Sequence, residues 1–386
     1  MILSIFMGYG TFKIAEDGID IAAFGMNRGN EIYTDTEKAG EKSKAEKVEK
    51  KGDSTPKNQG PEILNSGKKG EKSTENSSIN IVALGEIMMG GNVRQGLNGS
   101  YALAFKDISE YTKNADYTIA SLTTNVSNTE ELDNSKSKYI VDKGILNAFN
   151  ALGVDGLNIT SDHMLDFSTN MLRITQDILK SENIDIIGLR DNVTYVEKDG
   201  IRVAIIGINN VIIGNQYSYE EAGLNIYNLD RIKATISAAR QNADCVIIMT
   251  HYGKENVHEV TDVMEWFVRE LIEAGADLIL GGHSLGIYPV KEHNGKLIVY
   301  SLGYLIHDTD IEEGKKAAIF DITIDSNGDV KQLTLKPTYI LNKKEVKLYK
   351  DVGGQTFNTY FNNLRTGSDL ETYSIKEDAG KLIISK

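Results

Sequence analysis

Three apolar runs in the middle of this chain each end on a polar segment that contains a histidine. The runs are 156–159, 245–249 and 278–280, and the segments that follow are Thr160-Ser161-Asp162-His163, Thr250-His251-Tyr252-Gly253 and Gly281-Gly282-His283. Short apolar runs of this kind are typical of buried strands, whose polar ends in an open α/β sheet converge on one edge, where ligands and metals bind. We therefore expect an α/β fold with a metal-binding or phosphoester-binding site at the strand ends.

Charge argues against one class of partner. The chain carries 42 Lys and Arg against 55 Asp and Glu, a net charge of −13, and no basic stripe alternates with aromatic residues. Binding to nucleic acid requires clustered basic side chains that neutralise phosphates. We expect no nucleic-acid partner.

The single cysteine, Cys245, cannot form an internal disulfide. This fits a reduced compartment, and it equally fits an extracellular bacterial protein that does without disulfides. The beginning of the chain, 1–34, opens on a short apolar stretch that is too short to span a bilayer and lacks the basic start of a secretory signal. It is either a small core strand or frayed terminus, or the remnant of a signal or anchor.

The segment 35–78 is rich in Lys, Glu, Gly, Ser and Asn and holds two of the four prolines, Pro56 and Pro61. Such a composition buries too little apolar surface to offset the entropy of ordering, which predicts a disordered polar tether. A tether after a short apolar start fits a domain held away from a membrane.

The folded body is expected over 79–339. Turn signals at Asp199-Gly200, Asn294-Gly295 and Asn327-Gly328 predict three antiparallel hairpins, and helical spacing alternates with other apolar runs. This mixture favours two packed mixed sheets with helices outside, a four-layer α/β/β/α sandwich. The remainder, 340–386, is expected to be a C-terminal extension with some structure of its own.

Four side chains at the strand ends form the candidate site: Asp162, His163, His251 and His283. Imidazole and carboxylate are ligands for zinc, manganese and magnesium, and a hydrolytic centre needs several of them on one edge with an open position. A single histidine at a strand end is commonly a hydrogen-bonded structural residue, but three at equivalent positions favour a metal site. Spacing alone does not identify the metal.

Other acidic residues can support this site. Glu86 follows Gly85 at the end of the first body strand and is either a further ligand or a solvated turn carboxylate. Asp166 and Glu255 can orient His163 and His251 from behind, or serve as ordinary acids at a helix start. There is no nucleophile motif and no phosphate-binding loop. His258, His293 and His307 lie among polar residues and are expected on the surface.

Together these motifs resemble the CapA family of bacterial capsule synthesis proteins, accessory proteins of poly-γ-glutamate synthesis within the calcineurin-like metallophosphoesterase superfamily. The resemblance covers about 79–337. It rests on four segments: His251-Tyr252-Gly253-Lys254-Glu255 for the family's H-(W/Y)-G-x-E, the run from Ala274 to Gly281 that leads into G-x-H-x-H, Tyr300-Ser301-Leu302-Gly303 for Y-S-L-G-N, and 153–166 for the A-N-N-H segment. It implies a metallophosphatase-like fold.

The chain departs from the family pattern at several positions. Gly85-Glu86-Ile87-Met88 stands for G-D-x-M, Ser121-Leu122-Thr123 for N-L-E, Asp162 for an asparagine, Leu285 for the second histidine of G-x-H-x-H, and Tyr304 for the final asparagine. Carried over by the resemblance, one half of a two-metal centre remains, made of Asp162, His251 and His283, with His163 as the candidate catalytic acid. The other half retains only Glu86.

Two-metal hydrolysis relies on both ions, so the resemblance implies a single weak site for a divalent metal (Mn, Zn or Mg) or none. The expected function is an accessory role in the synthesis or export of a surface polyanion such as poly-γ-glutamate, with the polymer or its machinery as partner. Together with the tether, the resemblance implies a tethered location on the extracellular face of the bacterial cell membrane, with a cytoplasmic location left open. Two alternatives remain open: an active single-metal phosphoesterase, and a non-catalytic binding protein for another cell-envelope ligand.

Overall fold

The computed structural model describes residues 77–128, 137–211, 216–254 and 259–386. The predicted N-terminal segment and nearly all of the predicted tether lie outside the described residues, so their character stays a prediction.

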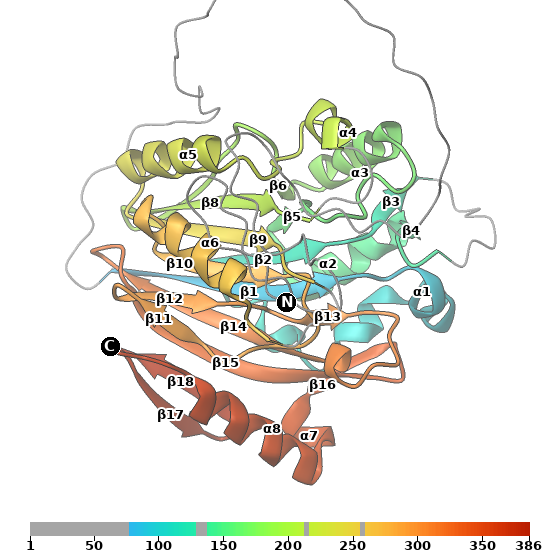
Figure 1. Cartoon of the computed structure of the whole chain (residues 1–386). Coiled ribbons are helices and arrows are strands. Elements are labelled where there is room, and N and C mark those ends of the chain that lie inside the picture. Colours follow the sequence, from blue (N-terminus) through green and yellow to red (C-terminus); the bar gives the residue numbers. More distant parts are fainter. Residues whose placement is uncertain (1–76, 129–136, 212–215, 255–258) are drawn as a thin grey trace, which may run out of the picture.

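The larger sheet has ten strands and is mixed (Figure 1). Its main path runs β17-β18-β15-β14-β1-β2-β5-β6, with β13 paired to β1 and β16 paired to β15. In chain order the strands are β1 (Ser78–Ile87), β2 (Tyr117–Leu122), β5 (Gly156–Asn158), β6 (Asp185–Ile187), β13 (Tyr304–Ile306), β14 (Lys316–Asp325), β15 (Val330–Leu341), β16 (Glu345–Leu348), β17 (Ser374–Asp378) and β18 (Lys381–Ser385). The neighbours β1, β2, β5 and β6 are parallel, so their carboxyl ends share one edge.

The smaller sheet has six strands in the order β11-β12-β10-β9-β8-β7. They are β7 (Thr194–Lys198), β8 (Ile201–Asn209), β9 (Cys245–His251), β10 (Leu278–Gly282), β11 (Lys291–His293) and β12 (Lys296–Val299). The pairs β8–β9, β9–β10 and β10–β12 are parallel. A separate two-stranded ladder joins β3 (Asn125–Ser127) and β4 (Ile140–Asp142).

Helices cover the outer faces of both sheets (Figure 1). The α-helices are α1 (Gly91–Leu97), α2 (Leu146–Leu152), α3 (Thr169–Ser181), α4 (Gln216–Glu221), α5 (Leu229–Asn242), α6 (Asp262–Glu273), α7 (Tyr349–Val352) and α8 (Gly354–Gly367). Short 3₁₀ turns are η2 (Tyr101–Phe105), η3 (Ser109–Tyr111), η4 (Lys143–Ile145) and η5 (Glu313–Lys315).

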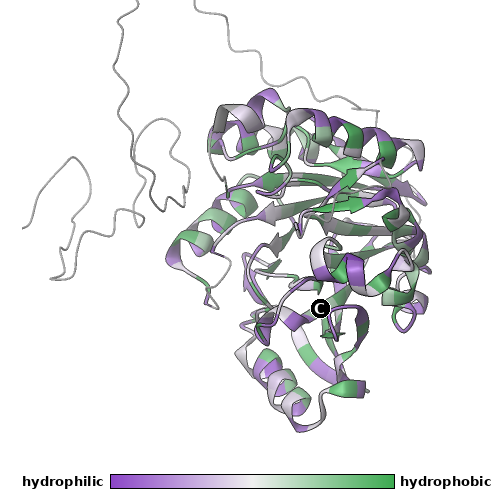
Figure 2. Ribbon diagram, turned by 90° about the vertical axis from the view of Figure 1, so that its right-hand side faces the viewer, coloured by the Kyte–Doolittle hydropathy of each residue, from purple (hydrophilic) through white to green (hydrophobic). Residues whose placement is uncertain are grey.

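Three apolar cores separate these layers. One lies between the two sheets and contains alternate residues of β1, β8 and β14, for example Ile81, Val203 and Phe320. A second packs α2 and α3 on the outside of the larger sheet, and a third packs α5 and α6 on the outside of the smaller one. The strands in the interior are mostly hydrophobic, whereas the helices carry both hydrophobic and hydrophilic residues (Figure 2). The predicted four-layer α/β/β/α sandwich is confirmed.

The three predicted hairpins are also present. β7 pairs with β8, β11 with β12 and β14 with β15, each antiparallel. Asp199 and Asn294, at the first position of two of the turns, adopt positive φ angles of 51°. This left-handed conformation is the one that Asp-Gly and Asn-Gly turns favour.

The region predicted as a C-terminal extension is structured and contacts the body. β16 and β18 both pair with β15, and α8 places Phe357, Phe361 and Leu364 in the core between the sheets. No helix in the described part of the chain combines the length and the apolar character that crossing a membrane requires.

Candidate metal centre

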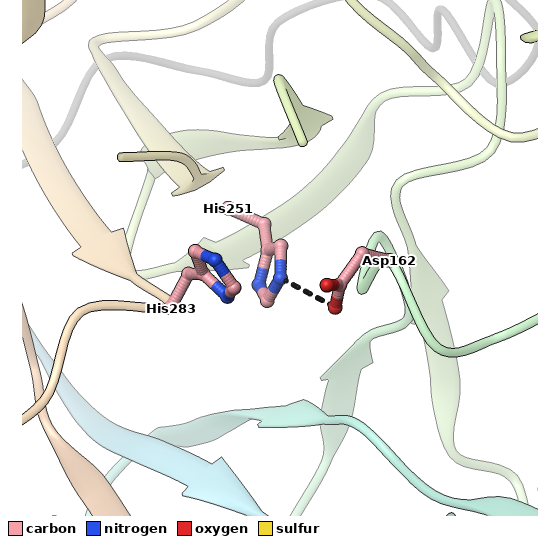
Figure 3. A group of neighbouring side chains, drawn as sticks. All are labelled: Asp162, His251 and His283. Atoms are coloured by element: carbon pink, nitrogen blue, oxygen red, sulfur yellow. Dashed lines mark hydrogen bonds and ion pairs between the residues drawn. The ribbon is translucent and has the colours of Figure 1, made fainter. Parts of the chain in front are cut away.

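The site lies where strands of both sheets reach their carboxyl ends. Glu86 is the penultimate residue of β1, and Asp162 lies in the loop that follows β5. His251 is the last residue of β9, and His283 comes directly after β10. These four side chains are at most 9% exposed, so the two sheets bring together residues nearly 200 positions apart. Figure 3 shows Asp162, His251 and His283 turned toward one another.

His251 lies between two carboxylates that come from different elements. Its Nε2 is 3.0 Å from Asp162 Oδ1, and its Nδ1 is 3.3 Å from Glu86 Oε1 (the contact to Asp162 is dashed in Figure 3). Burial alone would lower the pKa of His251, but the two carboxylates outweigh burial and raise it to about 10. Without a metal, His251 is therefore an imidazolium that donates from both ring nitrogens.

The same contacts keep both acids ionised. Burial would raise the pKa of Glu86 and of Asp162, but the positive charge and hydrogen bonds of His251 hold both below their ordinary values. Burial and the repulsion of His251 lower the pKa of His283 to about 4, so His283 is neutral. A neutral imidazole and ionised carboxylates are the forms that bind metals.

The backbone at His283 helps to position Glu86. His283 has a φ of 77°, a left-handed conformation that is unusual for a residue other than glycine. In this conformation its backbone N–H donates to Glu86 Oε1. Gly282 leaves room for the carboxylate, because a Cβ there would lie 2.8 Å from the same oxygen.

The motif from Tyr300 to Gly303 supports the same strand end from the other side. The backbone N–H of Glu86 donates to Gly303 O at 3.0 Å, and a Cβ on Gly85 would lie 2.1 Å from that carbonyl. The Ser301 hydroxyl donates to the carbonyls of Ser284 and Gly286 at 2.9 and 2.7 Å. This turn therefore ties the end of β1 to the loop after β10.

The donor set suits a divalent metal. Asp162, His251 and His283 each offer a ligand atom, and these atoms lie within 4.8 Å of one another. Ligands around one zinc ion lie within about 4.2 Å of each other, twice a bond of ~2.1 Å, so a small approach would complete the site. A metal bound here would take the place of the His251 proton.

His163, the candidate acid, lies beside this group. Its Nδ1 is 2.9 Å from Asp166 Oδ2, its Nε2 is 3.6 Å from Asp162 Oδ2, and its ring stacks on Tyr139 with centroids 3.5 Å apart. Burial lowers the pKa of His163, but Asp166 and Asp162 outweigh burial and leave it above its ordinary value. Asp166 therefore contacts His163, the residue that it is predicted to orient. Glu255 lies outside the described residues.

Two positions where the resemblance expects metal ligands, and one where it expects an asparagine, hold other side chains. Thr123, just past β2, donates its hydroxyl to Ile87 O at 3.3 Å. Leu285 packs with Tyr304 and Ile340 in a small apolar cluster. The Tyr304 hydroxyl donates to His283 O at 2.9 Å.

One prediction about the remaining histidines is wrong. His307 was expected on the surface, but it is only 6% exposed and lies directly after β13, whose parallel pairing with β1 carries it to the site. It lines one cavity together with Glu86, Met88, Thr123, Tyr139, Asp162, His163, His283 and Tyr304. The sequence carries the same signal here as at His251 and His283, because His307 ends the apolar run Leu305-Ile306. His258 lies outside the described residues.

Comparisons with known proteins bear on this site. The model of the family described as "Bacterial capsule synthesis protein PGA_cap" matches residues 80–309, more than half of the chain. The capsule biosynthesis protein CapA of Bacillus anthracis is 27% identical over 277 residues, 67% of this chain and 66% of that protein. The PGA biosynthesis protein CapA of Bacillus subtilis (strain 168) is 25% identical over 181 residues, 45% of this chain and 47% of that protein.

The matched part of the chain thus spans just under two thirds of one relative and about half of the other. Among solved structures, GAP50, the anchor in the inner membrane complex of Plasmodium, is similar with a TM-score of 0.41 and 13% identity, covering 76% of this chain and 97% of that one. A TM-score this low supports no conclusion about this chain. The family match runs from β1 to just past His307 and includes every candidate ligand. The chain therefore belongs to the bacterial capsule synthesis protein family PGA_cap.

Proposed function

We propose that this protein is an accessory factor in the synthesis or export of a capsular polyanion, poly-γ-glutamate being the expected polymer, and that its metal centre is incomplete. Family membership and the two CapA relatives support the capsule role. The observation that carries the second part is the asymmetry of the site. Asp162, His251 and His283 converge, whereas Thr123 and Leu285 stand where the resemblance expects a carboxylate and an imidazole.

A metal at this site would be held by Asp162, His251 and His283, with Glu86 within reach of His251. Such an ion would polarise an oxygen of a bound ligand or lower the pKa of a bound water. The chain's own part is to hold the ligands and to keep His163 beside Asp162. With one ion the site lacks the paired clamp of two-metal hydrolysis, so it acts mainly in binding.

The proposal includes a location. A polar tether and a short apolar start, if this start is part of an anchor, would hold the folded body at the outer face of the cell membrane. There it would meet the polymer or the machinery that makes and exports it. Because the body is acidic overall, a bound cation at this site would help it to approach a polyanion.

Complementation tests the capsule role. In a capsule-forming bacterium that lacks its own family member, the wild-type chain should restore surface polymer and H251A should not, because the alanine leaves Glu86 and Asp162 without their partner. The matched control is H293N, at a partly exposed histidine in β11. Full restoration by H251A would contradict a role for the site, and no restoration by the wild-type chain would contradict the capsule role.

A second candidate function is an active single-metal phosphoesterase. The placement of His163, held by Asp166 and 3.6 Å from Asp162, favours it because a general acid must lie within reach of the leaving group. Elemental analysis together with a phosphomonoester assay separates the two functions. Turnover that is metal-dependent and lost in H163N would replace the accessory proposal with the enzyme. If the protein holds no metal and folds unchanged after His163, His251 and His283 are all replaced, a different cell-envelope ligand is indicated.

A further inference from the structure

His307 is a buried histidine with an unused ring nitrogen. It is 6% exposed, and its Nδ1 has no hydrogen-bond partner among the described residues. Buried polar atoms are nearly always hydrogen-bonded, and an exception indicates a missing partner. Among the described residues that line the site cavity, His307 has the only buried side-chain nitrogen or oxygen in this state.

The ring of His307 is held in place by stacking. Its centroid is 4.2 Å from that of Tyr304 with an angle of 21° between the planes, and the Tyr304 hydroxyl is fixed on His283 O. A second histidine, His163, is also stacked on a tyrosine, Tyr139. The cavity is thus lined by two histidines that are each oriented by a tyrosine, beside the group of Asp162, His251 and His283.

The surroundings of His307 favour a hydrogen-bond acceptor as its partner. Burial, with the positive charge of Lys138 nearby, lowers the pKa of His307 to about 3, so the ring is neutral and one of its nitrogens carries a proton. The carboxylates of Glu86 and Asp162 are already engaged by His251 and by the backbone of His283. Lys138 and His163 place positive charge near the ring, and Glu86 and Asp308 place negative charge near it.

His307 does not belong to the metal group. The described residues that converge closely enough to hold an ion are Asp162, His251 and His283, and His307 is not one of them. It lies directly after β13 and stands where nothing in the resemblance assigned a role. A residue that lines the same cavity outside the metal ligands, and whose Nδ1 lacks a partner among the described residues, is suited to hold a second part of a ligand.

We propose that His307 donates from Nδ1 to an oxyanion of the bound ligand, a carboxylate or a phosphate, while the ligand also meets the metal group. The inference rests on the proposed binding function of the site and adds a ligand-binding residue to it. It assigns the cavity to a ligand with an acidic oxygen. A γ-glutamyl chain supplies that oxygen as carboxylate, and a phosphoester supplies it as phosphate.

Binding of two probes to the full chain tests the proposal. A γ-glutamyl tripeptide and phenyl phosphate are titrated separately into manganese-loaded protein by calorimetry, with the metal content of every sample measured. The accepted probe is the one that the wild-type chain binds. His307→Phe keeps a ring that can stack on Tyr304 but removes the nitrogen, and it should weaken binding of the accepted probe about tenfold or more. His307→Asn keeps a polar atom near the position of Nδ1 and should recover part of the affinity.

A spectroscopic readout separates binding from packing. In protein labelled with 15N-histidine, the accepted probe should shift the Nδ1 resonance of His307, and His293 serves as the control that should not move. Unchanged affinity in His307→Phe, loss of metal in that variant, or binding of neither probe by the wild-type chain would each overturn the proposal. Failure of capsule complementation with intact probe binding would instead overturn the capsule role and leave this assignment standing.

Discussion

Glu86 Oε1 lies 3.3 Å from His251 Nδ1, and this contact joins the ends of two strands that belong to different sheets. Glu86 belongs to β1 of the ten-stranded sheet and His251 to β9 of the six-stranded sheet. With Asp162 on the other ring nitrogen, the three groups form a buried ionic chain of two carboxylates and one imidazolium. Its behaviour without metal can be predicted directly.

H251A should destabilise the metal-free protein by about 3–5 kcal/mol, because it leaves two buried carboxylates without their cation. Chemical denaturation in a metal chelator measures the free energy of unfolding. The control H293A, at a partly exposed position, should change it by no more than about 0.5 kcal/mol. Equal stability of the two variants would contradict the ionic chain.

The stability of the metal-free protein should be greatest near pH 6 to 7. His251 has a folded pKa of about 10 against 6.5 in a free histidine, so its contribution is complete below about pH 6.5 and is lost as the pH rises toward 10. The lowered pKa values of Glu86, Asp162 and His283 act in the other direction, and their contributions are lost as the pH falls.

Unfolding measured from pH 4 to 10 checks both limbs. H251A should flatten the decline on the alkaline side, since the group that releases its proton there is gone. An alkaline limb of unchanged slope in H251A would assign that decline to other groups.

Metal binding should release about one proton, because His251 must give up its proton to become a ligand. Zinc or manganese affinity should therefore rise about tenfold per pH unit from pH 6 to 8. Calorimetry in two buffers of different ionisation enthalpy counts the protons. Asp162→Asn should weaken the affinity strongly, whereas Asp166→Asn, which alters the partner of His163, should leave the metal stoichiometry at one.

The double variant T123E/L285H should bind two metal ions where the wild-type chain binds one. It restores a carboxylate and an imidazole at positions that now hold a hydroxyl and an apolar side chain. Because Leu285 packs against Tyr304 and Ile340, the change should cost about 1–3 kcal/mol of stability. Leu285→Met is the control for packing, and elemental analysis of both variants decides the result. One ion in the double variant would show that more than these two ligands is missing.

The sequence alone carried the main elements of this site. Apolar runs that end on a histidine correctly located His251 and His283 at strand ends, because strands of a parallel sheet must finish on a common edge. The hairpin turns were readable for a similar local reason, since Asp-Gly and Asn-Gly tolerate the left-handed backbone.

The contacts between the sheets could not be read in this way. Nothing near Glu86 in the chain indicates that it will meet His251, because that contact depends on how two sheets pack on a shared core. His307 was missed because the run before it is short and its neighbours are polar, and only the pairing of β13 with β1 shows where it points. The domain boundaries at 339 and 340 stay a prediction, while the strands beyond them continue the sheet.

The left-handed backbone at His283 lets one residue perform two separate roles: its backbone N–H holds Glu86, and its ring is a candidate metal ligand. Since the amide of His283, and not its ring, holds Glu86, the side chain can be exchanged without releasing that acid. Cysteine or aspartate could be introduced there to change which ion is preferred. Position 283 is therefore the natural place to retune the metal preference of this pocket by engineering.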